Sequence, residues 1–299
     1  MFTIRQKEGS IEISNPENGF YASLNLNQGG RLEQLQIGNH PIIVDDPSFP
    51  YSDSYAAAIL FPFVSRVSRG SYEFNGKYFQ LHCNTADGQN ALHGLVYNKT
   101  FEFVSSDAND DECKVVLKLN QVEKQKGFPF TYQLLLTYTF SFSGISLSMK
   151  ATNTCDEFFP FTIGWHPYFS IPDFENATLQ FDADEQVVFD ENLIATGTKP
   201  NPFATPLQLG GNSFDDCFIV NDSQATLHTT IYDAKLQVDS DDFFLQIYTP
   251  PNLPMMAVEP MVGMSDSFNN KFGLMQLAPQ ESYQITWNID VTFNSNGLL

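Results

Sequence analysis

Four apolar segments of the sequence each contain one polar side chain that can bind a ligand or carry a proton. They are Arg66 in residues 61–67, His93 in 91–94, His166 in 163–169 and Glu259 in 256–261. Polar groups among apolar neighbours cost free energy unless they are hydrogen-bonded or used in function. These four residues are therefore the first candidates for a functional site.

His166 and Glu259 together predict acid/base chemistry. Burial raises the pKa of a glutamate from about 4.3 and lowers that of a histidine from about 6.5, so both approach the range for proton transfer near neutral pH. A histidine in an apolar run is more often a hydrogen-bonded core residue, and Arg66 can simply pair with a carboxylate. Glutamate is almost never buried without a partner or a purpose, which makes Glu259 the strongest candidate.

Motifs for cofactors, metals and covalent catalysis are absent from the sequence. It has no G-x-G-x-x-G, Walker, H-E-x-x-H, G-x-S-x-G or EF-hand pattern, and Asp239, Asp241 and Asp242 are expected to form a solvated acidic turn. The cysteines form no C-x-x-C pair and are expected to be buried free thiols: Cys83, Cys113, Cys155 and Cys217. We therefore expect neither a cofactor nor a metal, and a reaction that needs only concerted proton transfer.

Alternation of apolar and polar residues with a period of two dominates the chain and predicts strands. Residues 134–142 and 145–149, joined at Ser143-Gly144, are typical of a β-hairpin. The same alternation recurs in residues 11–14, 72–81 (around an Asn75-Gly76 turn), 114–119, 243–249 and 283–293. Long stretches of helical periodicity are almost absent, which favours an all-β sandwich or barrel.

The strand-like runs continue to Phe293 without an internal repeat or a linker rich in Gly, Ser or Pro, so residues 1–299 are expected to form one domain. The longest irregular stretch, Thr196 to Asn212, contains prolines and a Gly210-Gly211 pair. Long loops in compact chains are often functional, and we expect this stretch to cover a ligand pocket.

The composition is that of a folded acidic chain. Its 299 residues include 15 Lys and Arg against 35 Asp and Glu, for a formal charge of −20, and 42% are hydrophobic. Such a chain can bury enough apolar surface to fold while its charge lies on the solvated surface. A pI near 4.3 argues against nucleic-acid and anionic membrane partners and leaves an uncharged small molecule as the expected ligand. Without a signal peptide or an apolar membrane span, a cytoplasmic protein is expected, and its oligomeric state is left open.

Six short motifs follow one another along nearly the whole chain. They are Arg66, L-H-G at 92–94, H-P-Y-F at 166–169, F-D-D-C-F at 214–218, Q-I-Y-T at 246–249 and V-E-P at 258–260. Each motif is weak alone, but together and in this order they resemble the aldose 1-epimerase (galactose mutarotase) family, in its H-P-Y-F variant. The resemblance implies a large antiparallel β-sandwich, known as a supersandwich, in agreement with the strand pattern.

The resemblance also implies roles for individual residues. Glu259 matches the family's general base, which removes the proton of the anomeric hydroxyl, and His166 matches the general acid, which protonates the ring oxygen as the C1–O5 bond breaks. The open-chain aldehyde then rotates about C1–C2 and recloses, which interconverts the α and β anomers. The residues that match sugar-binding positions are Arg66, His93, Asp215 and Gln246. The family needs neither a cofactor nor a metal.

Departures from the family pattern concern sugar specificity. Ser65 stands where related sequences often have asparagine, and Leu95 stands where they often have a second glycine after L-H-G. A hexose-6-phosphate mutarotase would offer several basic groups to the phosphate, which here requires Arg66, Arg69 and Lys77 to come together. Because the chain has few basic residues, a neutral aldohexose is the expected substrate and a hexose 6-phosphate the alternative.

Two further alternatives come from other functional classes. A carbohydrate-binding β-sandwich without catalysis would also explain the many aromatic residues, since aromatic rings stack on sugar faces. Such a protein would have no need for both His166 and Glu259. A glycoside hydrolase with Glu259 and Asp215 as paired carboxylates would leave His166 unexplained.

Overall fold

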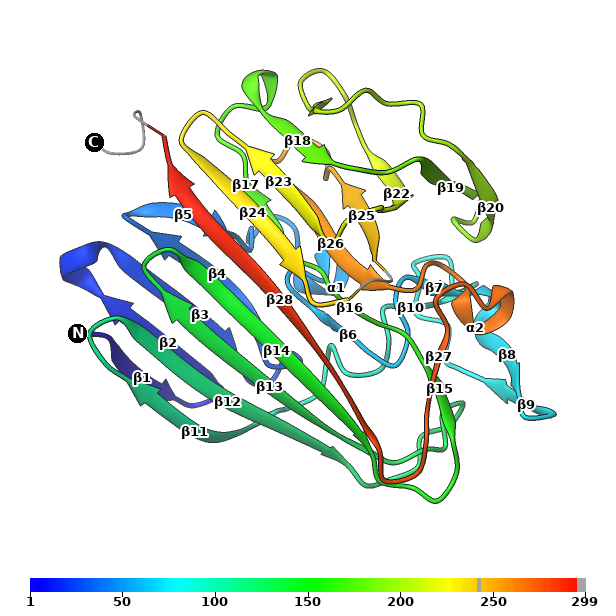
Figure 1. Ribbon diagram of the computed structural model, residues 1–299. Helices are drawn as coiled ribbons and strands as arrows, with labels where there is room; N and C mark the ends of the chain where they lie inside the picture. The colour runs from blue at the N-terminus through cyan, green and yellow to red at the C-terminus, as the bar shows by residue number, and fades with distance from the viewer. Residues whose placement is uncertain (241–242, 295–299) are drawn as a thin grey trace.

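Two large sheets dominate the computed structural model, which describes residues 1–240 and 243–294 (Figure 1). The larger sheet has 13 strands among these residues. In order across the sheet they are β1 (Thr3–Lys7), β2 (Ser10–Asn15), β3 (Phe20–Asn25), β4 (Arg31–Ile37), β5 (His40–Ile43), β17 (Tyr168–Ser170), β26 (Met255–Val262), β25 (Phe244–Tyr248), β22 (Asp215–Ile219), β19 (Glu185–Phe189) and β20 (Ala195–Pro200). Two more, β16 (Ile163–Trp165) and β6 (Ile59–Leu60), join the sheet beside β26.

The second sheet has nine strands within the described ranges and packs across the first (Figure 1). In order they are β11 (Glu102–Ala108), β12 (Glu112–Gln121), β13 (Tyr132–Ser141), β14 (Gly144–Asn153), β28 (Ser282–Phe293), β24 (Tyr232–Val238), β23 (Gln224–His228), β18 (Thr178–Phe181) and β21 (Leu207–Gln208). Strand pairs in both sheets are antiparallel. The predicted all-β antiparallel sandwich is confirmed.

Short strand pairs, single-turn helices and 3₁₀ turns make up the remaining regular structure of the described residues. They are β7 (Arg66–Val67) with β10 (Ala91–Leu92), β8 (Ser71–Phe74) with β9 (Lys77–Gln80), β15 (Phe159–Phe161) with β27 (Met275–Leu277), the helices α1 (Tyr51–Ser54) and α2 (Ser267–Asn270), and 3₁₀ turns at Pro16–Asn18, Ser68–Gly70 and Phe174–Asn176. Both α-helices are single turns. Among residues 1–240 and 243–294, no helix has the length and apolar character needed to cross a membrane.

The predicted hairpin of residues 134–149 shows how alternation builds the core. β13 and β14 pair from Tyr132 opposite Asn153 to Ser141 opposite Gly144. Buried and half-buried residues alternate along β13, and the buried set packs against the larger sheet. A Cβ at Gly144 would lie 1.9 Å from the carbonyl oxygen of Ile289 in the neighbouring strand, so only glycine fits where this hairpin turns.

The larger sheet carries side chains of functional types on the face turned away from this core. On β26, Met256 and Val258 pack between the sheets, whereas Glu259 points to the opposite face because successive strand residues alternate. The same alternation on β25 buries Ile247 in the core and leaves Gln246 on the face of Glu259. A sheet that is apolar on one face can therefore display a polar site on the other.

Three expectations from the sequence are corrected by the fold. Residues 196–212 do not line the cavity described below, because parts of this stretch belong to β20 and β21 at the edges of the two sheets. Cys113 and Cys217 are buried free thiols as predicted, but Cys83 and Cys155 are partly exposed free thiols.

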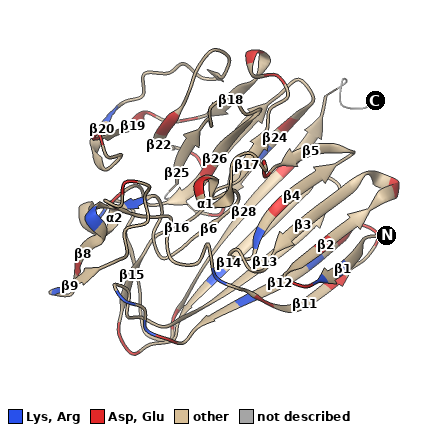
Figure 2. Ribbon diagram, turned by 180° about the vertical axis from the view of Figure 1, so that it is seen from behind, with Lys and Arg blue, Asp and Glu red and all other residues tan. Residues whose placement is uncertain are grey.

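The acidic charge lies on the surface, as expected. Glu259 and Asp266 are the buried carboxylates among the described residues, and Figure 2 shows Asp and Glu spread over loops and strands around the molecule. Of the predicted acidic turn, Asp241 and Asp242 lie outside the described ranges.

Candidate active site

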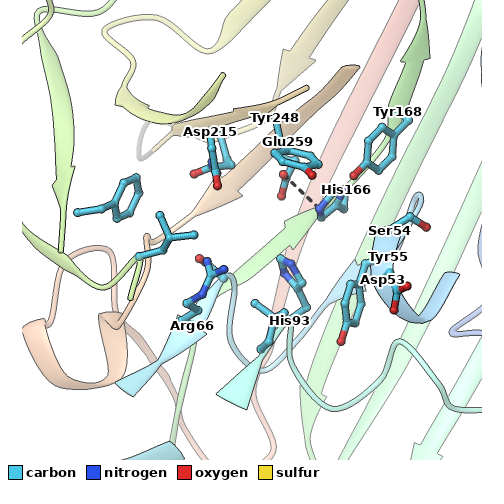
Figure 3. A pocket seen from close by; sticks show the side chains of 15 residues that line it. Asp53, Ser54, Tyr55, Arg66, His93, His166, Tyr168, Asp215, Tyr248 and Glu259 are labelled. Carbon is cyan, nitrogen blue, oxygen red and sulfur yellow. Dashed lines mark hydrogen bonds and ion pairs between the residues drawn. The ribbon is translucent and has the colours of Figure 1, made fainter. Parts of the chain in front are cut away.

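A cavity of 240 Å³ lies on the outer face of the larger sheet, over β17, β26, β25, β22 and β19 (Figure 3). Its walls come from α1, the β7–β10 pair and the turn between β19 and β20. The lining residues are Asp53, Ser54, Tyr55, Ser65, Arg66, Leu92, His93, His166, Tyr168, Phe189, Leu193, Asp215, Gln246, Tyr248 and Glu259. The fold thus brings together all the candidate residues of the sequence, which come from positions 66 to 259.

His166 and Glu259 are in contact at the centre of the cavity. His166 Nε2 lies 3.2 Å from Glu259 Oε1, and the two residues are only 5% and 2% exposed. The His166 backbone is fixed on both sides: its N–H donates to the Ala58 carbonyl (3.1 Å), and its carbonyl accepts from the Ala57 N–H (2.8 Å). Glu259 stands on the fully buried strand β26, so neither partner can move far.

Burial governs the protonation of this pair. Desolvation lowers the pKa of His166 to about 4 and raises the pKa of Glu259 well above its ordinary value. The negative charge of Asp215 adds to the rise for Glu259, and the positive charge of Arg66 opposes it. Both shifts favour a pair that carries no net charge, which is a pair that shares one proton.

Several buried polar atoms of the site have no partner among the described protein atoms. They are Glu259 Oε2, His166 Nδ1 and His93 Nδ1. Buried side-chain polar atoms nearly always have a hydrogen-bond partner in protein or ordered water, so three such atoms in one site mark it as unusual.

Arg66 and Asp215 form a second polar pair, facing one another across the cavity (Figure 3). Burial lowers the pKa of Arg66, which the charge of Asp215 opposes, and burial raises the pKa of Asp215, which the charge of Arg66 opposes. Gln246 Nε2 donates to Asp215 Oδ1 at 2.9 Å and so fixes that carboxylate from the neighbouring strand. This pair offers donors and acceptors suited to sugar hydroxyls.

His93 lies between the two halves of the site. Its ring centroid is 4.7 Å from that of Tyr55 and 5.1 Å from that of His166. The backbone N–H of His93 donates to the Ser65 carbonyl at 2.8 Å. Burial lowers the pKa of His93 well below its ordinary value, and the nearby His166 and Arg66 add to this, so the environment favours the neutral ring. A Cβ at Gly94 would lie 2.3 Å from the Phe61 carbonyl oxygen, which explains the glycine of the L-H-G motif.

Part of the backbone strain in the described residues lies in the lining of this cavity. Four lining residues that are not glycine have positive φ: Tyr55 (49°), Ser65 (46°), His93 (58°) and Leu193 (58°). Side chains with a Cβ rarely adopt this conformation, and such strain persists only where the surrounding structure imposes it, most often at functional sites. The strain supports this cavity as the functional site.

Sequence reasoning missed part of the lining. Tyr168 and Tyr248 lie two positions after His166 and Gln246 inside motifs already noted, so the period of a strand could have placed them on the same face. No local pattern indicated that α1 or the turn at Phe189 and Leu193 would join them, because those contacts depend on how the chain folds back.

The described part of the chain shows which groups are available to a metal or a phosphate. No group of three or more His, Cys, Asp or Glu side chains with metal-binding geometry occurs among residues 1–240 and 243–294. Arg66 lines the cavity, but Arg69 and Lys77 do not, and Lys77 Nζ instead pairs with Glu157 Oε2 at 3.1 Å on the surface. The basic cluster that a hexose 6-phosphate would require is therefore not assembled in this cavity.

Known proteins resemble this chain over most of its length. It is 22% identical over 285 residues to the uncharacterized protein YihR of Escherichia coli strain K12, covering 91% of this chain and 90% of that one. It is 23% identical over 283 residues to the maltose epimerase of Levilactobacillus brevis, covering 83% of this chain and 81% of that one.

A solved structure shares the fold. The galactose mutarotase-like protein of Clostridium acetobutylicum superposes with a TM-score of 0.85 at 17% identity, covering 98% of this chain and 99% of that one. This similarity confirms the galactose mutarotase-like sandwich. The family model for aldose 1-epimerase matches residues 9–290, which include every candidate site residue. The chain therefore belongs to the aldose 1-epimerase family of isomerases.

Proposed function

We propose that this protein interconverts the α and β anomers of a free, neutral aldose, with Glu259 as general base and His166 as general acid. The observation that carries the proposal is the buried 3.2 Å contact of His166 Nε2 with Glu259 Oε1 at the centre of the cavity. A base and an acid within hydrogen-bond reach of one another can serve two oxygens of one small ring.

The proton transfers balance over one turnover. Burial favours the shared proton on Glu259, so the reaction starts from the less populated form of the pair, with the proton on His166. From that form the Glu259 carboxylate accepts the proton of the anomeric O1 while His166 gives its proton to O5, and the C1–O5 bond breaks. The C1–O1 bond becomes the aldehyde, which rotates about C1–C2. Ring closure on the other face reverses both transfers, so Glu259 and His166 regain their starting states.

The remaining polar residues position the sugar. We expect Arg66 and His93 to hydrogen-bond the sugar near its reacting oxygens, and their position beside the His166–Glu259 pair supports this. Asp215, held by Gln246, is placed to accept hydrogen bonds from hydroxyls farther along the ring. The positive charge of Arg66 also favours the ionised form of Glu259, which a general base requires.

A neutral substrate follows from the charges around the cavity. Its lining contains one guanidinium, Arg66, against the carboxyl groups of Asp53, Asp215 and Glu259. An anionic sugar would meet these carboxylates without enough cations to offset the repulsion. The maltose epimerase among the relatives also supports a neutral sugar. We further propose that residues 1–299 act as one domain, because the main core cluster includes residues of both sheets.

Anomer exchange tests the proposal directly. Polarimetry on freshly dissolved α-D-glucose and α-D-galactose should show faster mutarotation with the protein than without it. Glu259→Gln should lower the rate by roughly 10²–10⁴-fold, because it removes a general base. Glu157→Gln, an exposed change at a residue 61% exposed, is the matched control and should keep full activity.

Two outcomes would contradict the proposal. Full activity of Glu259→Gln would show that the role of Glu259 is wrong. Sugar binding by the folded protein without any acceleration of anomer exchange would instead identify a carbohydrate-binding sandwich.

A further inference from the structure

Asp266 is a buried carboxylate that the proposed mechanism does not use. It is 8% exposed and lies in the turn between β26 and α2, seven positions after Glu259. Burial raises the pKa of Asp266, and the hydrogen bonds from Ser68 and Asn269 oppose this rise. Because a carboxylate is rarely buried without a partner or a purpose, its contacts indicate what it does.

Asp266 bonds the backbone on both sides of Val67. The backbone N–H of Asp266 donates to the Arg66 carbonyl at 2.7 Å, and Asp266 Oδ1 accepts from the backbone N–H of Ser68 at 2.8 Å. A residue of a parallel strand bonds two such groups with its own N–H and carbonyl, and here the carboxylate takes the place of the carbonyl. Strand β10 pairs with the other edge of β7, with Leu92 opposite Arg66. The backbone that carries Arg66 is therefore held along both edges.

The conformation of the turn fits this contact. Asp266 has a φ of 64°, in the left-handed region, which aspartate adopts more readily than most residues with a Cβ. Asn269 Nδ2 donates to Asp266 Oδ1 at 2.7 Å and so fixes the carboxylate. Such a backbone conformation persists where the surrounding structure imposes it, and here it presents both the N–H and the carboxylate of Asp266 to β7.

Arg66 depends on its backbone for its position. Its side chain points toward Asp215 across the cavity (Figure 3), but no hydrogen bond or ion pair joins its guanidinium to another residue in the ranges 1–240 and 243–294. The guanidinium instead interacts with the charges of Asp215, Asp87 and Glu259 at longer range. Its donors are therefore available to a sugar, and the backbone from which the side chain starts sets where they lie.

The same turn connects Arg66 to the strand of Glu259. Strand β26 ends at Val262, and three residues separate that end from Asp266. One of them, Met264, packs in a buried apolar cluster with Met261 of β26, which fixes the turn against the sheet. The hydrogen bonds of Asp266 thus set the position of Arg66 relative to Glu259.

We propose that Asp266 is a positioning residue, which holds Arg66 beside Glu259 and so determines how well Arg66 binds the reacting sugar. The inference rests on the proposed mutarotase function and adds to it a residue outside the lining of the cavity. Asp266 acts through the position of its carboxylate oxygen and not through its charge.

The first test changes the Asp266 side chain in two ways. Asp266→Gly removes the carboxylate at a position whose positive φ suits glycine, and it should lower kcat/KM for anomer exchange about tenfold. Asp266→Asn keeps Oδ1, which accepts both hydrogen bonds, and should keep the wild-type kcat/KM. Both are measured by polarimetry on glucose and galactose.

A double-variant cycle tests whether Asp266 acts through Arg66. Arg66→Met removes the guanidinium but leaves the backbone groups that Asp266 bonds. In the Arg66→Met background, Asp266→Gly should cause no further loss of kcat/KM, whereas independent effects would multiply. A merely structural role of Asp266 would lower kcat/KM equally in both backgrounds.

A second variant and a control accompany the cycle. Asn269→Ala, at an exposed residue, removes the donor that fixes the Asp266 carboxylate. It should lower kcat/KM less than Asp266→Gly does, and only when Arg66 is present. Lys271→Gly is the matched control, because Lys271 directly follows α2, is exposed, has a φ of 72° and lies outside the cavity lining. It should keep the wild-type kcat/KM, and urea unfolding midpoints show whether all variants are folded.

The outcomes separate this inference from the proposed function. Acceleration by the wild type, together with losses that multiply in the cycle, would overturn the positioning role and leave the mutarotase intact. Full activity of Asp266→Gly, or an Asp266→Asn variant as impaired as Asp266→Gly, would also overturn the positioning role. No acceleration of glucose or galactose by the wild type would overturn the proposed function, and the positioning role with it.

Discussion

The contact of His166 with Glu259 makes the protonation of each residue depend on the other. Because burial disfavours charge on both groups, the folded pair favours the state that holds one proton. In the unfolded chain the groups titrate separately, near the ordinary values of 6.5 for histidine and 4.5 for glutamate. The difference between the two states links the pair to stability as well as to catalysis.

The first prediction concerns the pH dependence of stability. Between pH 4.5 and 6.5 the folded and unfolded pairs each hold one proton, so the contribution of the pair is constant. Above pH 6.5 the unfolded histidine loses its proton while the folded pair keeps one, so this contribution falls as pH rises. From pH 4.5 down to about 4 the unfolded pair takes up a second proton before the folded pair does, so the contribution falls slightly as pH decreases. The contribution is measured as the difference in the free energy of unfolding, from urea titrations at each pH, between the wild type and the double variant His166→Asn/Glu259→Gln.

The difference should be greatest between pH 4.5 and 6.5 and fall on both sides. A difference that changes in one direction only over the whole range would show that the two groups do not share a proton in the fold.

Helix α1, which forms one wall of the cavity, is held by the buried guanidinium of Arg31. Arg31 on β4 is 2% exposed, and its guanidinium contacts Asp45 Oδ2 (2.7 Å) and the Ala56 carbonyl (3.2 Å) and lies 4.1 Å from the ring centre of Tyr51. Tyr51 begins α1, so Arg31 ties to the sheet the segment that brings Tyr55 to the cavity. A four-residue helix has too few internal hydrogen bonds to hold itself in place.

The second prediction follows from this contact. Arg31→Met should lower the free energy of unfolding by about 3 kcal/mol, because it leaves the buried Ala56 carbonyl and the half-buried Asp45 carboxylate without this donor. It should also raise KM more than it lowers kcat, since α1 positions a wall and not the reacting groups. Lys77→Met removes an exposed pair, with side chains 63% and 61% exposed, and should cost under about 1 kcal/mol. Equal losses in the two variants, by urea unfolding, would contradict the role of Arg31.

At the scale of the whole molecule, the charge and the site are separated. The chain has a formal charge of −20, yet Glu259 is buried in a strand whose residues are all buried. Surface carboxylates repel one another and destabilise the compact state, and salt screens this repulsion. The proposed reaction of a neutral sugar in the cavity should not depend on that screening.

The third prediction tests this separation. Raising the salt concentration from 10 to 150 mM at pH 7 should increase stability by about 1 kcal/mol, or roughly 2 °C in unfolding temperature, measured by calorimetry. The KM for a neutral sugar should stay the same. Near the pI of about 4.3 the net charge is small, so the salt effect on unfolding temperature should vanish there. An equal salt effect at both pH values would show that self-repulsion is not its cause.

Local patterns determined the strands and the candidate groups of this protein. The period of two in residues 134–149 predicts β13 and β14, because a strand exposes alternate residues to the core and the side chain pattern records that burial. Polar residues in apolar runs pointed to His166 and Glu259 for the same reason, since such placement is costly without a function. The ordered motifs added the family, the fold and the sugar-binding candidates.

Only the tertiary structure decided how these groups meet. The 3.2 Å contact of His166 with Glu259 joins residues 93 positions apart. Phe189 and Leu193 join the lining of the cavity because β19 pairs with β22. The stretch at 196–212, expected over the pocket, instead pairs at the sheet edges. The burial pattern is a local property of a strand, so the sequence by itself determined which side chains lie on each face of a strand. Strand order across a sheet depends on long-range pairing, so only the tertiary structure decided which of these side chains meet in the cavity.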